Sequence, residues 1–399
     1  MGVTGGTGGS ATSALPPLDV TKLPLVLAGP IVRRVDETGV TVWLALKAPR
    51  KVTLDVYEGA TGDLPATPTV TGTRVTARIG EHLHLVAVTA RTASGMKLRP
   101  GTIHRYALRF GEDTTSAAPV PTSAPGLFTP GVIAATEAES RKKLLYSGIA
   151  GAPTLPSFIT PPDKPERLRL FHASCRMPHA DGMDALSLLD HVLATDAGSP
   201  ERRPQQLLLT GDQIYADDVA DGLLHICSTY GRTLLGRDEE FPSLPPATKW
   251  LFQPGRRQEM MTGDFHLTTE YGDSHLVRLA EFCAMYLLVW SETLWPDVPP
   301  IRFFSELFPR DAQALGDPDP TELFGLRTKE SYKKAHERQM DYIAQCDRLD
   351  GFRTTLPEVR RALANTATYM SSTTTRSPTT GSSAAAGSTT SAAPRTAGG

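Results

Sequence analysis

Two apolar segments of strand length, each followed by a segment with helical periodicity, constrain the fold of this chain most strongly. "RLRLFHASC" (Arg167–Cys175) and "PQQLLLTGD" (Pro204–Asp212) are predicted strands, whereas "GMDALSLLDHVLAT" and the residues from about Asp217 are predicted helices. Apolar strands that alternate with helices are typical of a parallel sheet covered by helices. The sequence therefore predicts an α/β domain over residues 167–370.

The rest of this domain is predicted to be largely helical. Long helices are expected around His275–Trp295 and Thr328–Leu349, and a short one, "LPEVRRALAN", leads into a final strand, "TATYM". The segment between Asp221 and Arg327 is longer than a simple crossover connection. We expect it to form a helical insert that makes a lid or rim.

Residues 24–130 have a different pattern. Their β-branched or alternating segments are separated by Gly, Pro and Asp at the spacing of hairpins, and are Val40–Leu46, Lys51–Gly59, Thr71–Ile79, His82–Ala90 and Ile103–Phe110. Short strands at this spacing predict a β-sandwich of immunoglobulin or fibronectin type. A small β-barrel is the alternative. The chain is thus expected to be multidomain, with a β domain before the α/β domain.

Three segments are predicted to lie outside these domains. Residues 1–23 have no basic and no apolar region, so they are interpreted as a disordered leader rather than a signal peptide. Residues 131–166 are interpreted as a linker. Residues 371–399 consist almost entirely of Ser, Thr, Ala, Gly and Pro. Such a tail cannot offset the entropy cost of ordering, and we expect it to be disordered.

Charge and cysteine content exclude some classes of protein. Lys and Arg number 41 and Asp and Glu number 43, which indicates neither a nucleic-acid partner nor an electrostatic membrane anchor. The four cysteines form no CxxC pair, which argues against a zinc ribbon. No apolar run reaches the length of a transmembrane segment. The chain is expected to be soluble and cytoplasmic.

The stretch "LLLTGDQIYADD" carries the first set of candidate functional residues. Gly211 lets the backbone turn after the strand, so Asp212 lies just past its carboxyl end, where open α/β sheets place ligands. Tyr215 follows three residues later. A carboxylate and a phenolate on one short turn can bind the same hard metal ion. The alternative is that Asp212 caps a helix and Tyr215 is a packed ring.

The stretch "FHASCRMPHADGMDAL" carries the second set. Cys175, Arg176 and His179 follow a strand, and two adjacent parallel strands would place Cys175 beside Asp212. Binuclear metallophosphoesterases gather ligands from loop tips in this way. As alternatives, Cys175 is a small buried hydrophobic residue and His179 is a capping or surface imidazole. His172, inside the strand, is interpreted as structural.

Together these stretches resemble the PhoD-like (alkaline phosphatase D-like) metallophosphatases of the calcineurin-like phosphoesterase superfamily. The resemblance covers about Pro24 to Met370, includes a β-sandwich before the metal domain, and is most specific at residues 170–220. "GDQIY" is also similar to the purple acid phosphatase motif. The resemblance implies that Asp212 bridges two metals, that Tyr215 binds iron and that Cys175 replaces the usual Asp. It implies Fe³⁺ and Ca²⁺, with Mn²⁺ or Zn²⁺ as alternatives.

The resemblance implies a phosphoric ester hydrolase, either a phosphomonoesterase or a phosphodiesterase, with a phosphate ester as substrate. A metal-bound hydroxide would attack phosphorus in line. Arg176 and His179 would then stabilise charge on the phosphoryl oxygens and are the candidate catalytic residues.

The sequence departs from this family after Met370. The family continues with a motif close to "FDDHE", which binds the second metal, whereas this chain has "SSTTTRSPTTG". Ordinary codons for that segment, read one base earlier, encode "IFDDHEVTDDW". We therefore hypothesise a one-base deletion after Met370; a natural Ser/Thr-rich tail is the alternative. A truncated α/β domain would lack half of the metal site and expose a sheet edge, so little phosphatase activity and poor solubility are expected.

Two other functions fit the sequence. The chain could be a non-catalytic binding or adhesion protein whose β-sandwich is the functional module. Alternatively, Cys175 could be the nucleophile of an unrelated α/β hydrolase, but the sequence indicates no particular His/Asp pair to activate it.

Overall fold

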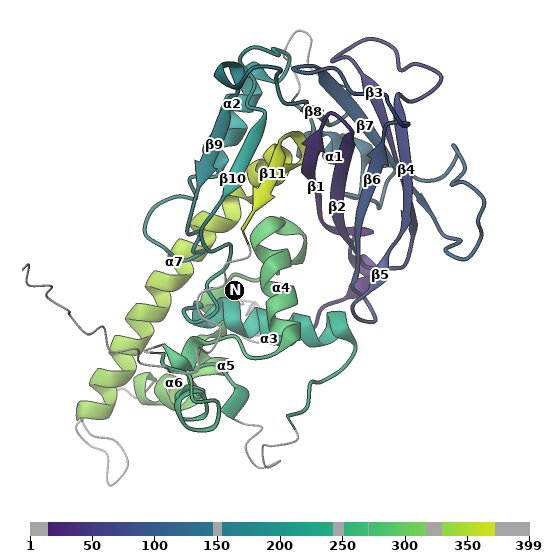
Figure 1. Ribbon diagram of the computed structural model, residues 1–399. Coiled ribbons are helices and arrows are strands. Elements are labelled where there is room, and N and C mark those ends of the chain that lie inside the picture. Colours follow the sequence, from purple (N-terminus) through teal and green to yellow (C-terminus); the bar gives the residue numbers. More distant parts are fainter. Residues whose placement is uncertain (1–14, 147–153, 242–250, 270, 317–328, 372–399) are drawn as a thin grey trace, which may run out of the picture.

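The computed structural model describes residues 15–146, 154–241, 251–269, 271–316 and 329–371 (Figure 1). They form a mixed α/β structure with two antiparallel four-stranded sheets and one parallel three-stranded sheet. The predicted tail and most of the predicted leader lie outside the described residues. No helix in the described ranges is long and apolar enough to cross a membrane.

The two antiparallel sheets share one hydrophobic core. The first has the strand order β1-β2-β6-β5 and the second the order β4-β3-β7-β8. Their bounds are β1 Val26–Asp36, β2 Gly39–Leu46, β3 Lys51–Glu58, β4 Val70–Val75, β5 Ala77–Arg78, β6 His84–Arg91, β7 Ile103–Gly111 and β8 Ser157–Ile159. Leu54 and Val56 of β3 lie in the same buried cluster as Val42 and Leu44 of β2. The alternation of apolar and polar residues that predicted these strands therefore places one face of each sheet in the core. Their assignment to the fibronectin or immunoglobulin type stays a prediction.

The parallel sheet has the order β11-β10-β9. Its strands are β9 Leu170–Ala173, β10 Gln206–Leu209 and β11 Ala367–Met370. Leu207 and Leu209 of β10 pack in the same cluster as Leu189 and Leu193, which belong to helix α2 (Ser187–Asp196). Figure 1 shows α2 beside this sheet. The predicted order of strand, helix and strand is present, with shorter elements than the sequence suggested.

The remaining helices are α1 Glu137–Leu144, α3 Asp221–Leu235, α4 Leu279–Trp290, α5 Phe304–Leu307, α6 Pro309–Leu315 and α7 Lys329–Asn365. Helices α3 to α6 form the predicted helical insert between β10 and α7 (Figure 1). Asp217 and Asp218 were expected to cap α3, but the helix begins at Asp221, and its N-cap Ala220 makes no side-chain hydrogen bond.

A single helix, α7, replaces the two helices predicted over residues 328–365. Pro357 lies inside it. Proline removes one backbone hydrogen bond and normally ends a helix. Here Phe352, Leu356 and Val359, on either side of Pro357, are buried in the main hydrophobic cluster. Their packing outweighs the lost hydrogen bond, so the predicted break does not occur.

The predicted linker and the end of the predicted leader both contain ordered structure. In residues 131–166, Thr136 and Glu139 form a reciprocal capping box that begins α1, and β8 pairs with β7. These hydrogen bonds explain why a segment rich in Pro and Ala is not a free linker. Before β1, Leu15 is buried, and Lys47 donates hydrogen bonds to the carbonyl oxygens of Val20 and Leu23.

Hydrogen bonds join the parallel sheet to the antiparallel sheets. The hydroxyl of Tyr369 in β11 accepts from the backbone N–H of Val35 at 3.2 Å and lies 3.1 Å from its carbonyl oxygen. Tyr106, fully buried in β7, donates to the carbonyl oxygen of Ala364 at 2.8 Å. Buried side-chain hydrogen bonds of this kind fix the relative position of packed elements.

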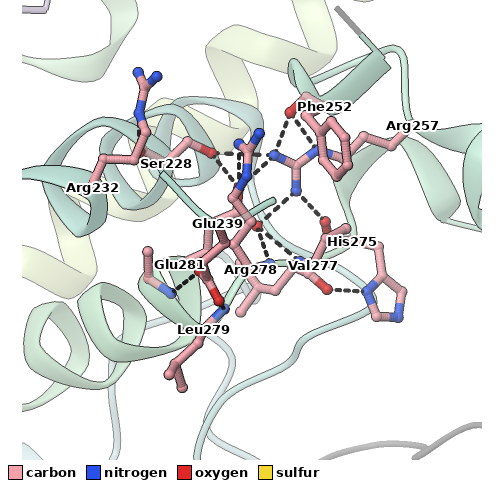
Figure 2. A network of polar contacts seen from close by, with 12 residues as sticks. Ser228, Arg232, Glu239, Phe252, Arg257, His275, Val277, Arg278, Leu279 and Glu281 are labelled. Carbon is pink, nitrogen blue, oxygen red and sulfur yellow. Dashed lines mark hydrogen bonds and ion pairs between the residues drawn. The ribbon is translucent and has the colours of Figure 1, made fainter. Parts of the chain in front are cut away.

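A buried polar network holds the insert together (Figure 2). The guanidinium of Arg257 contacts both carboxylate oxygens of Glu281 in α4, at 2.7 and 3.0 Å, and both side chains are 0% exposed. Ser228 of α3 donates to the same carboxylate at 2.8 Å. The network therefore ties the segment around residue 257 to both α3 and α4.

Candidate metal centre

The predicted juxtaposition of two loop tips is present. β9 and β10 are parallel neighbours, with Ala173 opposite Leu209, so the segments that follow them leave the sheet at the same edge. The backbone N–H of Arg176 donates to the carbonyl oxygen of Asp212 at 2.9 Å. The two stretches singled out from the sequence thus contact each other directly.

Gly211 makes this close approach possible. A Cβ atom at this position would lie 1.9 Å from Oγ of Ser174, 2.7 Å from the backbone nitrogen of Cys175 and 3.0 Å from its Sγ. No other residue type would fit without moving the first loop. The small residue that the sequence indicated as a turn therefore serves mainly as a contact point between the loops.

Cys175 is an exposed thiol in an unusual backbone conformation. Its φ of 56° lies in the left-handed region, which costs a non-glycine residue about 1 kcal/mol or more. Hydrogen bonds from Ser174, Tyr215 and the backbone of Asp212 lower the pKa of this thiol, against an opposing effect of the Asp212 carboxylate. The interpretation of Cys175 as a small buried hydrophobic residue is therefore wrong, because its side chain is exposed.

Tyr215 lies within hydrogen-bonding reach of Cys175. Burial raises the pKa of its phenol, and the hydrogen bond from Cys175 and the charges of Cys175, Asp212 and Asp217 raise it further. Several acidic groups thus repel one another around the phenol oxygen. A cation placed among them would relieve this repulsion.

Arg176 is engaged by protein groups. Its Nε and Nη2 contact Oδ2 of Asp184 at 3.0 and 2.7 Å, and Nη1 donates to the carbonyl oxygen of Val289. The guanidinium lies 4.8 Å from the ring centroid of Trp290 and 4.6 Å from that of Phe352. Such stacking is favourable for a guanidinium. A role in binding phosphoryl oxygens stays a prediction and requires Arg176 to leave Asp184.

His179 lies apart from the three proposed metal ligands. It is 8% exposed, and its Nε2 is 3.3 Å from Oδ1 of Asp218. Its buried Nδ1 has no hydrogen-bond partner among the described residues. The cavity between the loop tips has a volume of about 180 Å³ and is lined by Cys175, Arg176 and Asp212 but not by His179. The catalytic role of His179 also stays a prediction.

Sequence reasoning missed two contributors to this site. Ser174 contacts Sγ of Cys175 at 3.2 Å, and Asp184 holds Arg176. Asp184 lies in the stretch quoted for the site, and an Asp at this distance from an Arg in one loop was a usable signal. Ser174 had no signal, because its contact depends on the turn at Cys175.

The donors in this place fit part of a metal site. The described residues contain no group of three or more His, Cys, Asp or Glu side chains that could hold a metal ion. Cys175 and Asp212 supply two such groups, and the phenol of Tyr215 is a third donor of a different type. This donor set, with its mutual repulsion, fits one ion and does not fit a two-metal centre.

Comparison with known proteins places little weight on any family. No protein family model matches the chain, and no curated protein matches it. A solved structure described as "Structure of PhoD" is similar to 51% of this chain, at a TM-score of 0.27 and 13% sequence identity. The match covers 30% of that protein's length. The chain therefore has a weak structural similarity to PhoD, at a level that does not assign it to a family.

Proposed function

We propose that this chain derives from a metal-dependent phosphoric ester hydrolase of the PhoD-like type, and that in its present form it binds one metal ion without completing hydrolysis. The observation that carries the proposal is the contact between the two loop tips at Gly211, which gathers Cys175, Asp212 and Tyr215. Three acidic donors from two adjacent parallel strands form the type of site that holds a hard cation.

In this proposal the chemistry is divided between an ion and the side chains around it. A metal ion in a phosphoesterase makes a bound water more acidic and neutralises charge on the phosphate oxygens. The carboxylate of Asp212, the phenol of Tyr215 and the thiol of Cys175 would hold that ion. Arg176 would supply positive charge to the phosphoryl oxygens after release from Asp184. Fe³⁺, Ca²⁺, Mn²⁺ and Zn²⁺ are the candidate ions.

The course of β11 supports the hypothesis of a one-base deletion after Met370. β11 is parallel to β10, and Met370 lies opposite Leu209. The backbone N–H of Ser371 donates to the carbonyl oxygen of Leu209 at 2.8 Å. The residues that follow therefore leave the sheet at the same edge as Asp212. This is where the acidic residues and histidine of a second half-site would be needed. The coding DNA tests the hypothesis: a neighbouring frame without "DDHE" would end it.

We expect the purified chain to retain metal through Asp212. After incubation with Mn²⁺ or Zn²⁺ and gel filtration, metal analysis should give up to one ion per chain, and Asp212→Asn should lower retention about tenfold or more, because the variant loses an anionic ligand. Asp181→Asn is a matched control: Asp181 lines the same cavity, but its side chain is 89% exposed and pairs with Arg348. Equal metal content in the parent chain and Asp212→Asn would contradict the site.

We expect no measurable hydrolysis of p-nitrophenyl phosphate by the chain of 399 residues in the presence of Ca²⁺ or Fe³⁺. One half-site cannot clamp both the attacking and the leaving oxygen of an in-line displacement. A chain in which the frame after Met370 is restored should hydrolyse the ester, and Asp212→Asn should abolish that activity. Turnover by the chain in its present form would show that the described site is sufficient.

A non-catalytic binding protein is the second candidate function. It predicts no metal retention and places the function on the antiparallel sheets. A polar groove on the outer face of β3 favours this alternative, and its chemistry can be argued independently of the metal site.

A further inference from the structure

The outer face of the sheet formed by β4, β3 and β7 carries a groove with a volume of about 790 Å³, within the range of ligand-binding cavities. Strands contribute its floor, and the segments around residues 66–68 and 116–122 form its walls. The side chains used in the argument are Lys51, Thr53, Asp55, Tyr57, Thr73 and Arg109.

The alternation of β3 explains the floor. Val52, Leu54 and Val56 point into the core and are fully buried, so Lys51, Thr53, Asp55 and Tyr57 lie on the opposite face. Outward-facing polar residues are normally solvated. Here Asp55 is only 4% exposed and Thr53 only 3% exposed, because the walls enclose them. The groove is therefore a formed recess and not an open sheet surface.

Side chains of the floor hold one wall in place. Nζ of Lys51 donates to the carbonyl oxygens of Ser116 and Ala118, the latter at 2.7 Å. Nη1 of Arg109 donates to the carbonyl oxygen of Val120 at 2.6 Å. These contacts fix the wall without a ligand, so binding would require little ordering of the protein.

The floor favours a ligand without charge. Nε and Nη2 of Arg109 contact Oδ2 of Asp55 at 2.9 and 2.8 Å, and Nη1 is bound to Val120. All three nitrogens of this guanidinium are thus engaged by the protein. An anionic ligand would find no uncommitted guanidinium on the floor, whereas Asp55 and Arg109 neutralise each other.

The remaining hydrogen-bonding capacity matches hydroxyl groups. Oδ1 of Asp55 accepts one hydrogen bond, from Thr71 at 2.8 Å, and can accept another. The hydroxyls of Thr53 and Thr73 lie 2.8 Å apart and can each make further hydrogen bonds. At the end of the row, the partly exposed ring of Tyr57 offers an aromatic surface and a hydroxyl. Carboxylate, hydroxyls and an aromatic ring are the groups that recognise a sugar, whose rings combine apolar C–H faces with hydroxyls.

The row from Lys51 to Tyr57 extends roughly 20 Å, at about 3.3 Å per residue of strand. This length exceeds a single sugar ring. We infer that the groove binds a neutral oligosaccharide or a segment of a neutral polysaccharide, with Tyr57 against a ring face and Asp55, Thr53 and Thr73 bound to hydroxyls. The inference does not depend on the proposed metal site.

Affinity electrophoresis of the full chain tests this inference. Native gels would contain a soluble β-glucan, xylan, mannan or α-glucan as neutral probes, or heparin as the anionic probe. At least one neutral polysaccharide should retard the chain. Tyr57→Ala should weaken that retardation about tenfold, and Tyr57→Phe should weaken it less, because the ring is kept. Tyr271→Ala, which removes a tyrosine that is 56% exposed elsewhere, should have no effect.

Three results would overturn the inference: no retardation by any neutral polysaccharide, retardation by heparin only, or unchanged retardation of both Tyr57→Ala and Thr73→Ala. Thermal unfolding of each variant shows whether a loss of binding comes from misfolding. Asp212→Asn should bind the polysaccharide as the parent chain does, so a failure of the metal site and a failure of this groove would be distinguished.

Discussion

Arg257→Met should lower the free energy of unfolding by about 3–5 kcal/mol, measured by urea denaturation at neutral pH. Both Arg257 and Glu281 are 0% exposed (Figure 2). Methionine fills similar space but leaves the carboxylate buried without its main counter-charge. The backbone N–H groups of Val277 and Arg278 also donate to this carboxylate, at 2.8 and 3.2 Å, so it cannot turn toward water without losing them.

The loss should also depend on pH. Burial raises the pKa of Glu281, but Arg257 and the hydrogen bonds around the carboxylate lower it by more, so that it lies below its usual value. Without Arg257, burial dominates, and the pKa in the folded variant rises above that in the unfolded chain. An acid whose pKa is raised by folding destabilises the protein increasingly as pH rises. The deficit of Arg257→Met should therefore be larger at pH 8 than at pH 5.

Two further variants make this prediction specific. Arg237→Met removes an exposed arginine near the end of α3 and should change the free energy of unfolding by less than about 0.5 kcal/mol. The double variant Arg257→Met/Glu281→Leu removes the stranded charge and should recover at least half of the loss. A loss below about 1 kcal/mol for Arg257→Met would show that the network contributes little to stability.

The strands that the sequence predicted well are those with uninterrupted alternation. β3 places Val52, Leu54 and Val56 on one face within a short segment, so the signal is local. β1 is not among the predicted strands, although it is the longest. Gly29, with a φ of 93°, and the following proline interrupt its pattern, and a Cβ at Gly29 would lie 2.8 Å from the carbonyl oxygen of Trp43. That requirement comes from the neighbouring strand and cannot be read from β1 alone.

The errors around α7 and the predicted linker have a similar origin. Pro357 is a correct local signal for a helix end, and packing against distant residues overrides it. The start of α1 could have been found, because Thr136 and Glu139 have the spacing of a capping box. β8 could not, because its three residues form a strand only by pairing with β7.

The candidate site divides along the same line. The contact between the loops of Cys175 and Asp212 followed from the topology of parallel strands, which the sequence indicated. The environment of Arg176 did not follow. Trp290 and Phe352, which lie against its guanidinium, come from α4 and α7, far along the chain. Sequence reasoning can identify a charged residue at a strand end, but its partners depend on how distant helices pack.

Acid should destabilise the chain in part through Glu292, and this is the second large effect that we expect. Its carboxylate lies 2.5 Å from Nζ of Lys143 and 3.3 Å from Nη1 of Arg360, and the side chain is 16% exposed. Burial raises the pKa of Glu292, but Arg360 and Lys143 lower it by more, to about 2. The carboxyl therefore binds its proton more weakly in the folded chain than in the unfolded chain.

The sign of the effect follows from this difference. A group whose pKa is lowered by folding contributes stability above its unfolded value, near 4.5, and loses that contribution as pH falls toward 2. The shift corresponds to about 3 kcal/mol. Glu292→Gln cannot make this contribution, so the difference in free energy of unfolding between the parent chain and the variant should shrink by about 3 kcal/mol between pH 6 and pH 2. Urea denaturation at several pH values measures it.

A matched control is Glu112→Gln, which removes a carboxylate that is 83% exposed and lies 3.3 Å from Nη2 of Arg50. An exposed pair contributes little, so this variant should follow the pH dependence of the parent chain. A constant difference between the parent chain and Glu292→Gln over the whole pH range would mean that Lys143 and Arg360 do not hold the carboxylate charged. Because these two cations come from α1 and α7, whereas Glu292 follows α4, the measurement also tests whether the three helices are joined at this point.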